Sequence, residues 1–265
     1  MRLGGKATRK GGPVSTQPQP LGRRERGKLE RAARIADAAA TLFDEAPFAD
    51  VTTEAIARAA DVAEGTLFRY ACSKTELLVL ALNTRFEAAL DRGLSTAAAL
   101  DPLDTVGRVD ALAGALLAIG DERPDNAALY QRELLFPTIG GDYLSEGERI
   151  ARRWELAIAE PFEELAASLA SASGAAATEV DPTQPPAPAG EAPAAPAAVG
   201  HLATEARLAG SAAWDAIQLS VARRARAGFP LLSRADLRGQ FELLVRALNR
   251  TEVVNNTPTT QQESR

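Results

Sequence analysis

Apolar side chains recur at helical spacing along most of the chain, and this pattern predicts an all-α fold. From about Lys28 onward alanine, leucine, arginine and glutamate dominate, and runs of β-branched residues are scarce. The first strongly periodic segment, about Leu29–Glu45, carries one apolar stripe and ends at Pro47. The stripe consists of Ile35, Ala39, Leu42 and Phe43. No strand is needed to explain any part of the pattern.

The same criteria predict a series of further helices. Thr52 or Thr53 is suited to cap the second helix, and Ser73 with Glu76 forms a capping-box pattern at the start of a long fourth helix. We expect helices at about Thr52–Ala60, Ala63–Tyr70, Ser73–Ala98, Asp104–Ile119, Asp125–Phe136, Glu146–Ala170, Gly200–Ala227 and Ser233–Asn249.

Composition shifts divide the chain into a small and a large helical part. Residues 1–28 are rich in glycine, proline and basic residues, so we expect a disordered basic arm. Residues 29–78 form a three-helix head, and residues 79–250 form a larger helical body. A low-complexity Ala/Pro segment at 171–199 predicts a flexible loop within the body, and residues 251–265 predict a disordered tail.

The segment Thr52–Tyr70 has the pattern of a helix-turn-helix. Helices this short are unstable alone, so they need a shared core. Asp61 stands where the turn requires a residue that tolerates left-handed backbone. The residues spaced to fill the core are Ile56, Ala57, Ala60, Val62 and Leu67. The second helix is then held with its far face open to a DNA major groove. The alternative is two ordinary amphipathic helices in a bundle.

Composition narrows the possible classes of function. The chain is 46% hydrophobic, without the run of about 20 apolar residues that a membrane span needs and without the apolar core of a signal peptide. We expect a cytoplasmic protein without membrane contact. The single cysteine, Cys72, and the single histidine, His201, argue against a disulfide, a metal centre and a Ser/His/Asp triad. We expect no cofactor, no metal and no enzymatic activity.

The distribution of charge indicates where a polyanion would dock. The net charge is −5, but residues 1–78 carry 13 Lys and Arg against 10 Asp and Glu, and the rest carries 17 against 25. The cations of the arm include Lys6, Arg9, Lys10, Arg23, Arg24, Arg26 and Lys28. We expect the arm to follow phosphates or enter a minor groove. The alternative is a solvated tail.

Residues 31–78 resemble the DNA-binding domain of the TetR family (tetracycline-repressor-like) of transcriptional regulators. The matching residues are Arg34-Ile35, Ala38-Ala39, Leu42-Phe43, Thr52, Ile56-Ala57, Ala60, Val62, Gly65-Thr66-Leu67, Arg69, Lys74 and Glu76-Leu77-Leu78. The chain departs from the family pattern at Pro47, Asp61, Ala63, Phe68, Tyr70 and Ala71. Because Ala63 cannot cap the recognition helix, Asp61 with Glu64 is a candidate substitute.

The resemblance and the chemistry of the motif predict which residues contact DNA. Thr52, Tyr70 and Lys74 are expected phosphate contacts, and the backbone at Gly65 approaches the DNA. Base edges are expected to meet Ala63, Glu64, Thr66, Leu67 and Arg69, and Thr53 and Phe68 complete the candidate interface. The alternative role for Glu64 is support of the helix dipole.

The resemblance further implies that the body binds a small-molecule inducer and dimerises. Candidate ligand contacts are the large residues Tyr130, Phe136, Trp154, Phe162 and Trp214, although core packing is the alternative for each. Two apolar stripes in the last two helices are expected at a homodimer interface, with packing inside one chain as the alternative. They consist of Leu202, Ala206, Ala209, Ala213 and Ile217, and of Leu237, Phe241, Leu244, Val245 and Leu248.

Together these features predict a sequence-specific transcriptional regulator that binds operator DNA and is released by an apolar or amphipathic ligand. Repression is the behaviour implied by the resemblance. The alternatives are an architectural DNA-binding protein without a ligand, a helical enzyme with a DNA-binding head, and a purely structural helix bundle. The scarcity of histidine and cysteine argues against the enzyme.

Overall fold

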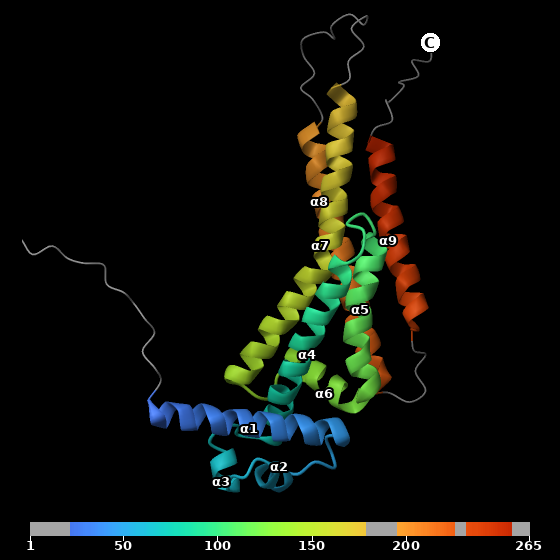
Figure 1. The fold of residues 1–265 in the computed structure, drawn as a ribbon. Coiled ribbons are helices and arrows are strands. Elements are labelled where there is room, and N and C mark those ends of the chain that lie inside the picture. The colour runs from blue at the N-terminus through green and yellow to red at the C-terminus, as the bar shows by residue number, and fades with distance from the viewer. Residues whose placement is uncertain (1–21, 179–194, 226–231, 256–265) are drawn as a thin grey trace, which may run out of the picture.

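The computed structural model describes residues 22–178, 195–225 and 232–255, and every regular element within these ranges is a helix (Figure 1). The prediction of an all-α fold is confirmed. The helices are α1 (Arg23–Glu45), α2 (Thr53–Ala59), α3 (Glu64–Leu67), α4 (Lys74–Ala98), α5 (Thr105–Glu122), α6 (Pro124–Leu135), α7 (Asp142–Thr178), α8 (Ala195–Arg224) and α9 (Arg234–Asn255). None of the helices in the described ranges is long and apolar enough to cross a membrane.

The first three helices form a small head at one end of the molecule. Helix α1 lies across the lower end of the long helices, and α2 and α3 lie on the side of α1 that faces away from them (Figure 1). Ile35 and Phe43 of α1, Ile56 of α2, Leu67 of α3 and Leu77 of α4 are all at most 1% exposed. Helix α4 therefore belongs to both parts, because its first turn closes the core of the head and its remainder enters the body.

The body is a bundle in which α7 and α8 form a long pair beside α4, α5 and α9 (Figure 1). Gly210 of α8 faces Ala159 of α7 so closely that a Cβ atom at Gly210 would lie 2.7 Å from the Ala159 Cα. Glycine is therefore required for this approach of the two helices. Short α6 fills the space between the head and the α7–α8 pair, in contact with α4, α5 and α8.

Helix boundaries differ from the sequence prediction mainly where a helix continues into polar or low-complexity sequence. Helix α1 begins at Arg23, so residues 23–28, expected in the arm, are helical. Helices α7 and α8 extend to Thr178 and from Ala195, into the expected loop 171–199, and α9 runs to Asn255, into the expected tail. Residues 23–28 are exposed or partly exposed, so they carry no apolar period from which a helix could be predicted. Residues 1–21, 179–194, 226–231 and 256–265 lie outside the described residues.

The apolar stripes expected at a dimer interface pack mostly within this chain. Ala206 and Ile217 of α8 are 0% exposed, as are Leu237 and Phe241 of α9. Leu202, Ala209, Ala213 and Leu248 are at most 5% exposed. Helix α8 packs against α7, α5 and α9, and α9 also packs against α5 and α7, so these faces form the core of the body. The buried residues of both stripes therefore pack within one chain, whereas Leu244 and Val245 are only partly buried, and dimerisation through the last two helices stays a prediction.

Candidate nucleic-acid interface

The turn between α2 and α3 has the geometry that the sequence predicts. Thr52 caps α2, because its hydroxyl accepts a hydrogen bond from the Ala55 amide at 3.1 Å. Asp61 has a φ of +52°, and the next amide, that of Val62, donates to the Ala57 carbonyl at 3.0 Å. Asp61 therefore supplies the left-handed turn residue for which glycine is the usual choice.

The recognition helix is shorter than predicted, and it is followed by turns with hydrogen bonds between residues three apart. Helix α3 covers only Glu64–Leu67, and the amides of Arg69 and Tyr70 then donate to carbonyls three residues earlier, at Thr66 and Leu67. No side chain caps its start at Ala63. The substitute cap considered for Asp61 and Glu64 is not formed. The Glu64 carboxylate instead accepts a hydrogen bond from the Thr53 hydroxyl at 2.8 Å, which joins α3 to the start of α2.

Most of the expected DNA contacts lie on the open side of this segment. Ala63, Glu64, Gly65 and Arg69 are exposed, Phe68 is 42% exposed, and Thr53, Thr66 and Tyr70 are partly exposed. Leu67 is 0% exposed, so the expectation that it reads a base edge is wrong. It is the residue of α3 that points into the core of the head, and its burial sets the opposite face outward.

Lys74 is bound within the head rather than free for a phosphate. Its ammonium nitrogen donates to the carbonyls of Phe48 at 2.7 Å and Val51 at 2.8 Å, and it lies 4.2 Å from the centroid of the Phe48 ring. These contacts close the loop between α1 and α2 onto the start of α4. The structure therefore gives Lys74 a different role from the expected phosphate contact, because carbonyls already occupy its donors.

A basic cleft flanks the recognition segment. It has a volume of about 680 Å³ and lies between the first half of α1 and the end of the recognition segment. Four cationic side chains and one acid line it, together with Thr66 and the Tyr70 phenol. The charged residues are Arg24, Glu25, Lys28, Arg31 and Arg69. This excess of positive charge beside an exposed recognition helix suits a phosphate backbone.

Sequence reasoning missed Arg31 as part of this cleft. Arg24, Lys28 and Arg31 stand at i, i+4 and i+7, which places them on one face of a helix. That spacing becomes informative only once α1 is known to begin at Arg23, since residues up to Lys28 were expected in a disordered arm.

Buried polar contacts join the head to α6. The Asn126 side chain donates from Nδ2 to the carbonyls of Phe43 at 2.7 Å and Ala46 at 3.1 Å, and its Oδ1 accepts from the Phe48 amide at 2.7 Å. One residue before α6, Arg123 donates to the Asp44 carbonyl at 2.6 Å. We call this set the α6 junction. It fixes the end of α1 and the loop after it to the body.

Three of the five expected ligand contacts meet in the body. Tyr130 of α6, Trp154 of α7 and Trp214 of α8 line one small cavity. Phe162 is 0% exposed but does not line this cavity. Phe136 is 72% exposed, which corrects its placement in a pocket. It follows the last residue of α6, where the chain leaves the helix, and so it points away from the core.

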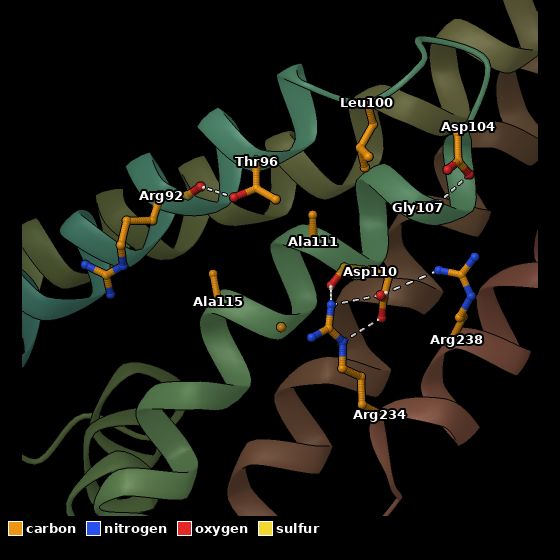
Figure 2. A pocket seen from close by; sticks show the side chains of 11 residues that line it. Arg92, Thr96, Leu100, Asp104, Gly107, Asp110, Ala111, Ala115, Arg234 and Arg238 are labelled. Atoms are coloured by element: carbon orange, nitrogen blue, oxygen red, sulfur yellow. Dashed lines mark hydrogen bonds and ion pairs between the residues drawn. The ribbon is translucent and has the colours of Figure 1, made fainter.

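A second, open cleft lies between α4, α5 and α9 (Figure 2). Its volume is about 490 Å³, and ion pairs between α5 and α9 occupy one side of it. Asp110 of α5 receives both Arg234, whose Nε lies 3.0 Å from Oδ1, and Arg238, whose Nη1 lies 3.5 Å from Oδ2. The guanidinium of Arg234 fits beneath α5 because residue 114 is glycine. These ion pairs attach the start of α9 to α5.

An exposed recognition segment, supported on two helices and flanked by cations, defines a DNA-binding head of the helix-turn-helix class. Comparison with known families agrees. Residues 35–81 match the family model described as bacterial regulatory proteins of the tetR family. The match assigns this N-terminal segment, residues 35–81, to the tetR family.

Similar proteins resemble this chain mainly in the head. It is 47% identical over 64 residues to the HTH-type transcriptional repressor KstR of Rhodococcus jostii (strain RHA1), which is 24% of this chain and 30% of that protein. It is 47% identical over 58 residues to KstR of Mycolicibacterium smegmatis, covering 22% of this chain and 28% of that protein. The chain thus matches less than a third of the length of either relative.

Solved structures cover more of the chain at lower identity. A tetR-family transcriptional regulator from Streptomyces coelicolor is 19% identical, with a TM-score of 0.49 over 86% of this chain and 84% of that one. The fatty acid degradation regulator FadR from Bacillus halodurans is 16% identical, with a TM-score of 0.47 over 82% of this chain and 96% of that one.

Proposed function

We propose that this protein is a homodimeric, sequence-specific transcriptional repressor that leaves its operator when a small apolar or amphipathic molecule binds the body. The observation that carries the proposal is the recognition segment 63–70, whose open side is solvent-exposed while Leu67 anchors it in the core. The KstR proteins that share the head sequence are described as transcriptional repressors.

Contacts to DNA divide between the recognition segment and the basic cleft. Glu64, Thr66 and Arg69 present polar atoms or a methyl group to base edges, Ala63, Gly65 and Phe68 contribute contact surface, and the Thr53 hydroxyl orients Glu64. Thr52, Tyr70 and the cations of the cleft contact phosphates. Leu67 and Lys74 act indirectly, by holding this segment and the preceding loop in place.

Selection of bound sites from a randomised pool of duplex DNA tests this function. We expect enrichment of a two-fold symmetric sequence whose half-sites lie about one helical turn apart. Replacing Arg24 and Arg31 with glutamine should then weaken binding and reduce the slope of log K against log salt by about 4, since the dimer loses four phosphate contacts and each contributes about 0.9. The control is Arg152→Gln, an arginine of α7 whose side chain is 63% exposed. Enrichment of no sequence, or an unchanged salt slope, would count against the proposal.

The dimer interface requires a different face from the buried stripes. Leu208 and Leu219 of α8 are 66% and 48% exposed and stand 11 residues apart, which places them on the same side of the helix. Leu243 of α9 is 62% exposed. Exposed leucines on neighbouring helices mark a surface for association. We propose that these faces of α8 and α9 meet their copies in the partner.

Light scattering on variants tests this interface. The double variant Leu208→Glu/Leu243→Glu should halve the measured mass and lose affinity for the two-half-site operator, because charges would be desolvated between the subunits. The matched control is Leu156→Glu, since Leu156 of α7 is also exposed, at 53%. A double variant that keeps the wild-type mass would rule out this face.

Two connections transmit a change in the body to the head. Helix α4 contributes Leu77 to the core of the head and Phe86 to the cavity beside Tyr130 and Trp154. Helix α6 carries Tyr130 and, one turn earlier, Asn126 of the junction. A ligand that shifts either helix would respace the two heads of the dimer and so disfavour the DNA-bound conformation. Operator DNA must then lower ligand affinity by the same factor.

A further inference from the structure

The small cavity in the body is walled by aromatic side chains. Phe86, Tyr130, Trp154 and Trp214 line it, and the first two stack with ring centroids 4.5 Å apart. The other lining residues are Gln131, Leu134, Ile150, Ala151 and Gln218. The cavity measures only about 10 Å³, which is room for a single water molecule at most. Any larger molecule must therefore push the walls apart.

Hydrogen bonds within the wall occupy most of its polar atoms. The Tyr130 hydroxyl donates to Asn83 Oδ1 at 2.8 Å, and the Trp154 indole nitrogen donates to the Phe86 carbonyl at 3.2 Å. Gln131 donates from Nε2 to Gln218 Oε1 at 2.5 Å. The phenol and the indole therefore act in packing, and neither is left to orient a ligand.

The remaining amide oxygen of Gln131 has no partner. Gln131 is 3% exposed, and its Oε1 is one of two buried side-chain polar atoms in the described ranges without a hydrogen bond, the other being Ser220 Oγ. A buried acceptor without a donor loses its hydrogen bonds to water and gains none in return, so such atoms are rare in folded proteins. An apolar residue of the same length would fill this position without that cost.

We propose that Gln131 is the polar recognition residue of the ligand site, and that its Oε1 accepts a hydrogen bond from an N–H or O–H group on an otherwise flat, apolar ligand. The proposal rests on the proposed function, since it names the class of molecule to which the body responds. The four aromatic residues provide stacking surfaces for a planar body, and the unpaired oxygen provides one directional contact among them.

Trp214 is the wall residue best placed to make room. Phe86, Tyr130 and Trp154 are at most 4% exposed, whereas Trp214 is partly exposed on α8. A ligand that displaces the Trp214 indole can contact both the aromatic side chains of the cavity and the Gln131 oxygen. Gln131 lies on α6 five residues after Asn126, which holds the head. A ligand bound to Gln131 therefore contacts the same helix that is attached to the head.

Titration with two isosteric probes tests this assignment. Indole carries an N–H donor, and benzofuran has the same shape with an oxygen in place of that group. The two tryptophans of the chain both line the cavity, so their side-chain N–H signals in ¹⁵N-labelled full-length protein report on this site. We expect indole to shift both signals and to bind about tenfold more tightly than benzofuran, the effect of one hydrogen bond to a buried acceptor.

Substitutions locate the preference at Gln131. In Gln131→Met, indole should bind no more than about twice as tightly as benzofuran, whose own affinity should change little, because Met keeps the length of the side chain and removes the acceptor. The matched control, Gln240→Met on α9, should keep the tenfold preference.

Three results would overturn the assignment: equal binding of the two probes by the wild-type protein, a preference that survives Gln131→Met, or no shift of either tryptophan signal up to the solubility of the probes. The first and third need no variant, so they hold even if the variant fails to fold. A symmetric DNA site selected by a protein that shows one of these results would leave the proposed function standing and remove only this ligand class. A preference for indole in a protein that selects no DNA site would support this ligand class and count against the proposed function.

Discussion

Helix α6 buries polar side chains in two regions, and these side chains differ in how many of their hydrogen bonds are formed. At its start, in the α6 junction, Asn126 is 1% exposed and makes three hydrogen bonds to the end of α1 and the loop after it. Near its middle, in the wall of the cavity, Gln131 is 3% exposed and makes one hydrogen bond, leaving an oxygen unpaired. The same chemical group, a carboxamide, is fully used in one place and half used in the other.

The difference separates a structural polar residue from one available for binding. Burial of an amide is tolerated when its hydrogen bonds replace those lost from water, and Asn126 meets that condition. Glu133, further along α6 and 0% exposed, meets it too: its carboxylate accepts from the Thr138 amide at 2.9 Å and hydroxyl at 2.7 Å. Burial alone would raise the pKa of Glu133, but hydrogen bonds from Arg132 and Thr138 hold it below its usual value. Gln131, between these two, is the exception.

The largest effect should come from breaking the junction. Asn126→Ala removes three hydrogen bonds and leaves the Phe43 and Ala46 carbonyls and the Phe48 amide to find new partners. We expect the free energy of unfolding to fall by about 2–4 kcal/mol. Urea denaturation measures this loss, and amide hydrogen exchange should accelerate most at residues 43–48.

Asn249→Ala provides the matched control for the junction. Asn249 is an exposed residue of α9, so its replacement should change stability by less than about 0.5 kcal/mol. If Asn126→Ala behaved like this control, the junction would not hold the head to the body, and the route through α6 would lose its basis.

The head could be predicted closely because its determinants are local. The capping residues Thr52 and Ser73 act on amides three residues away, and Asp61 acts on its own backbone. The core residues Ile56 and Leu67 lie within one short motif. Every one of these relations fits inside a window that a sequence pattern can scan, so the helix-turn-helix could be placed without coordinates. The open face could be placed too, except for Leu67, which the same pattern assigns both to the core and to a base edge.

The body could be predicted only as helices, because its specific contacts are long-range. The stripe that includes Ala206 and Ile217 shows a buried face but not whether α7 of the same chain or a second copy covers it. Gln131 and Gln218 are 87 residues apart, and neither residue type is expected in a core. Even in the head, the contacts of Lys74 could not be predicted for this reason, since its partner carbonyl at Phe48 lies 26 residues away.

The smallest effect should come from the cavity, and it is the sharpest test of the contrast along α6. Gln131→Met removes an unpaired buried oxygen together with one hydrogen bond to Gln218, a partly exposed residue that water can reach. The stability gained by removing the unpaired oxygen and the stability lost with the hydrogen bond are of similar size. We therefore expect the free energy of unfolding to stay unchanged or rise by up to about 1 kcal/mol. Urea denaturation beside Asn126→Ala measures it under identical conditions. A loss of about 2 kcal/mol or more would place Gln131 with Asn126 as a structural residue, and the distinction between the two regions of α6 would fail.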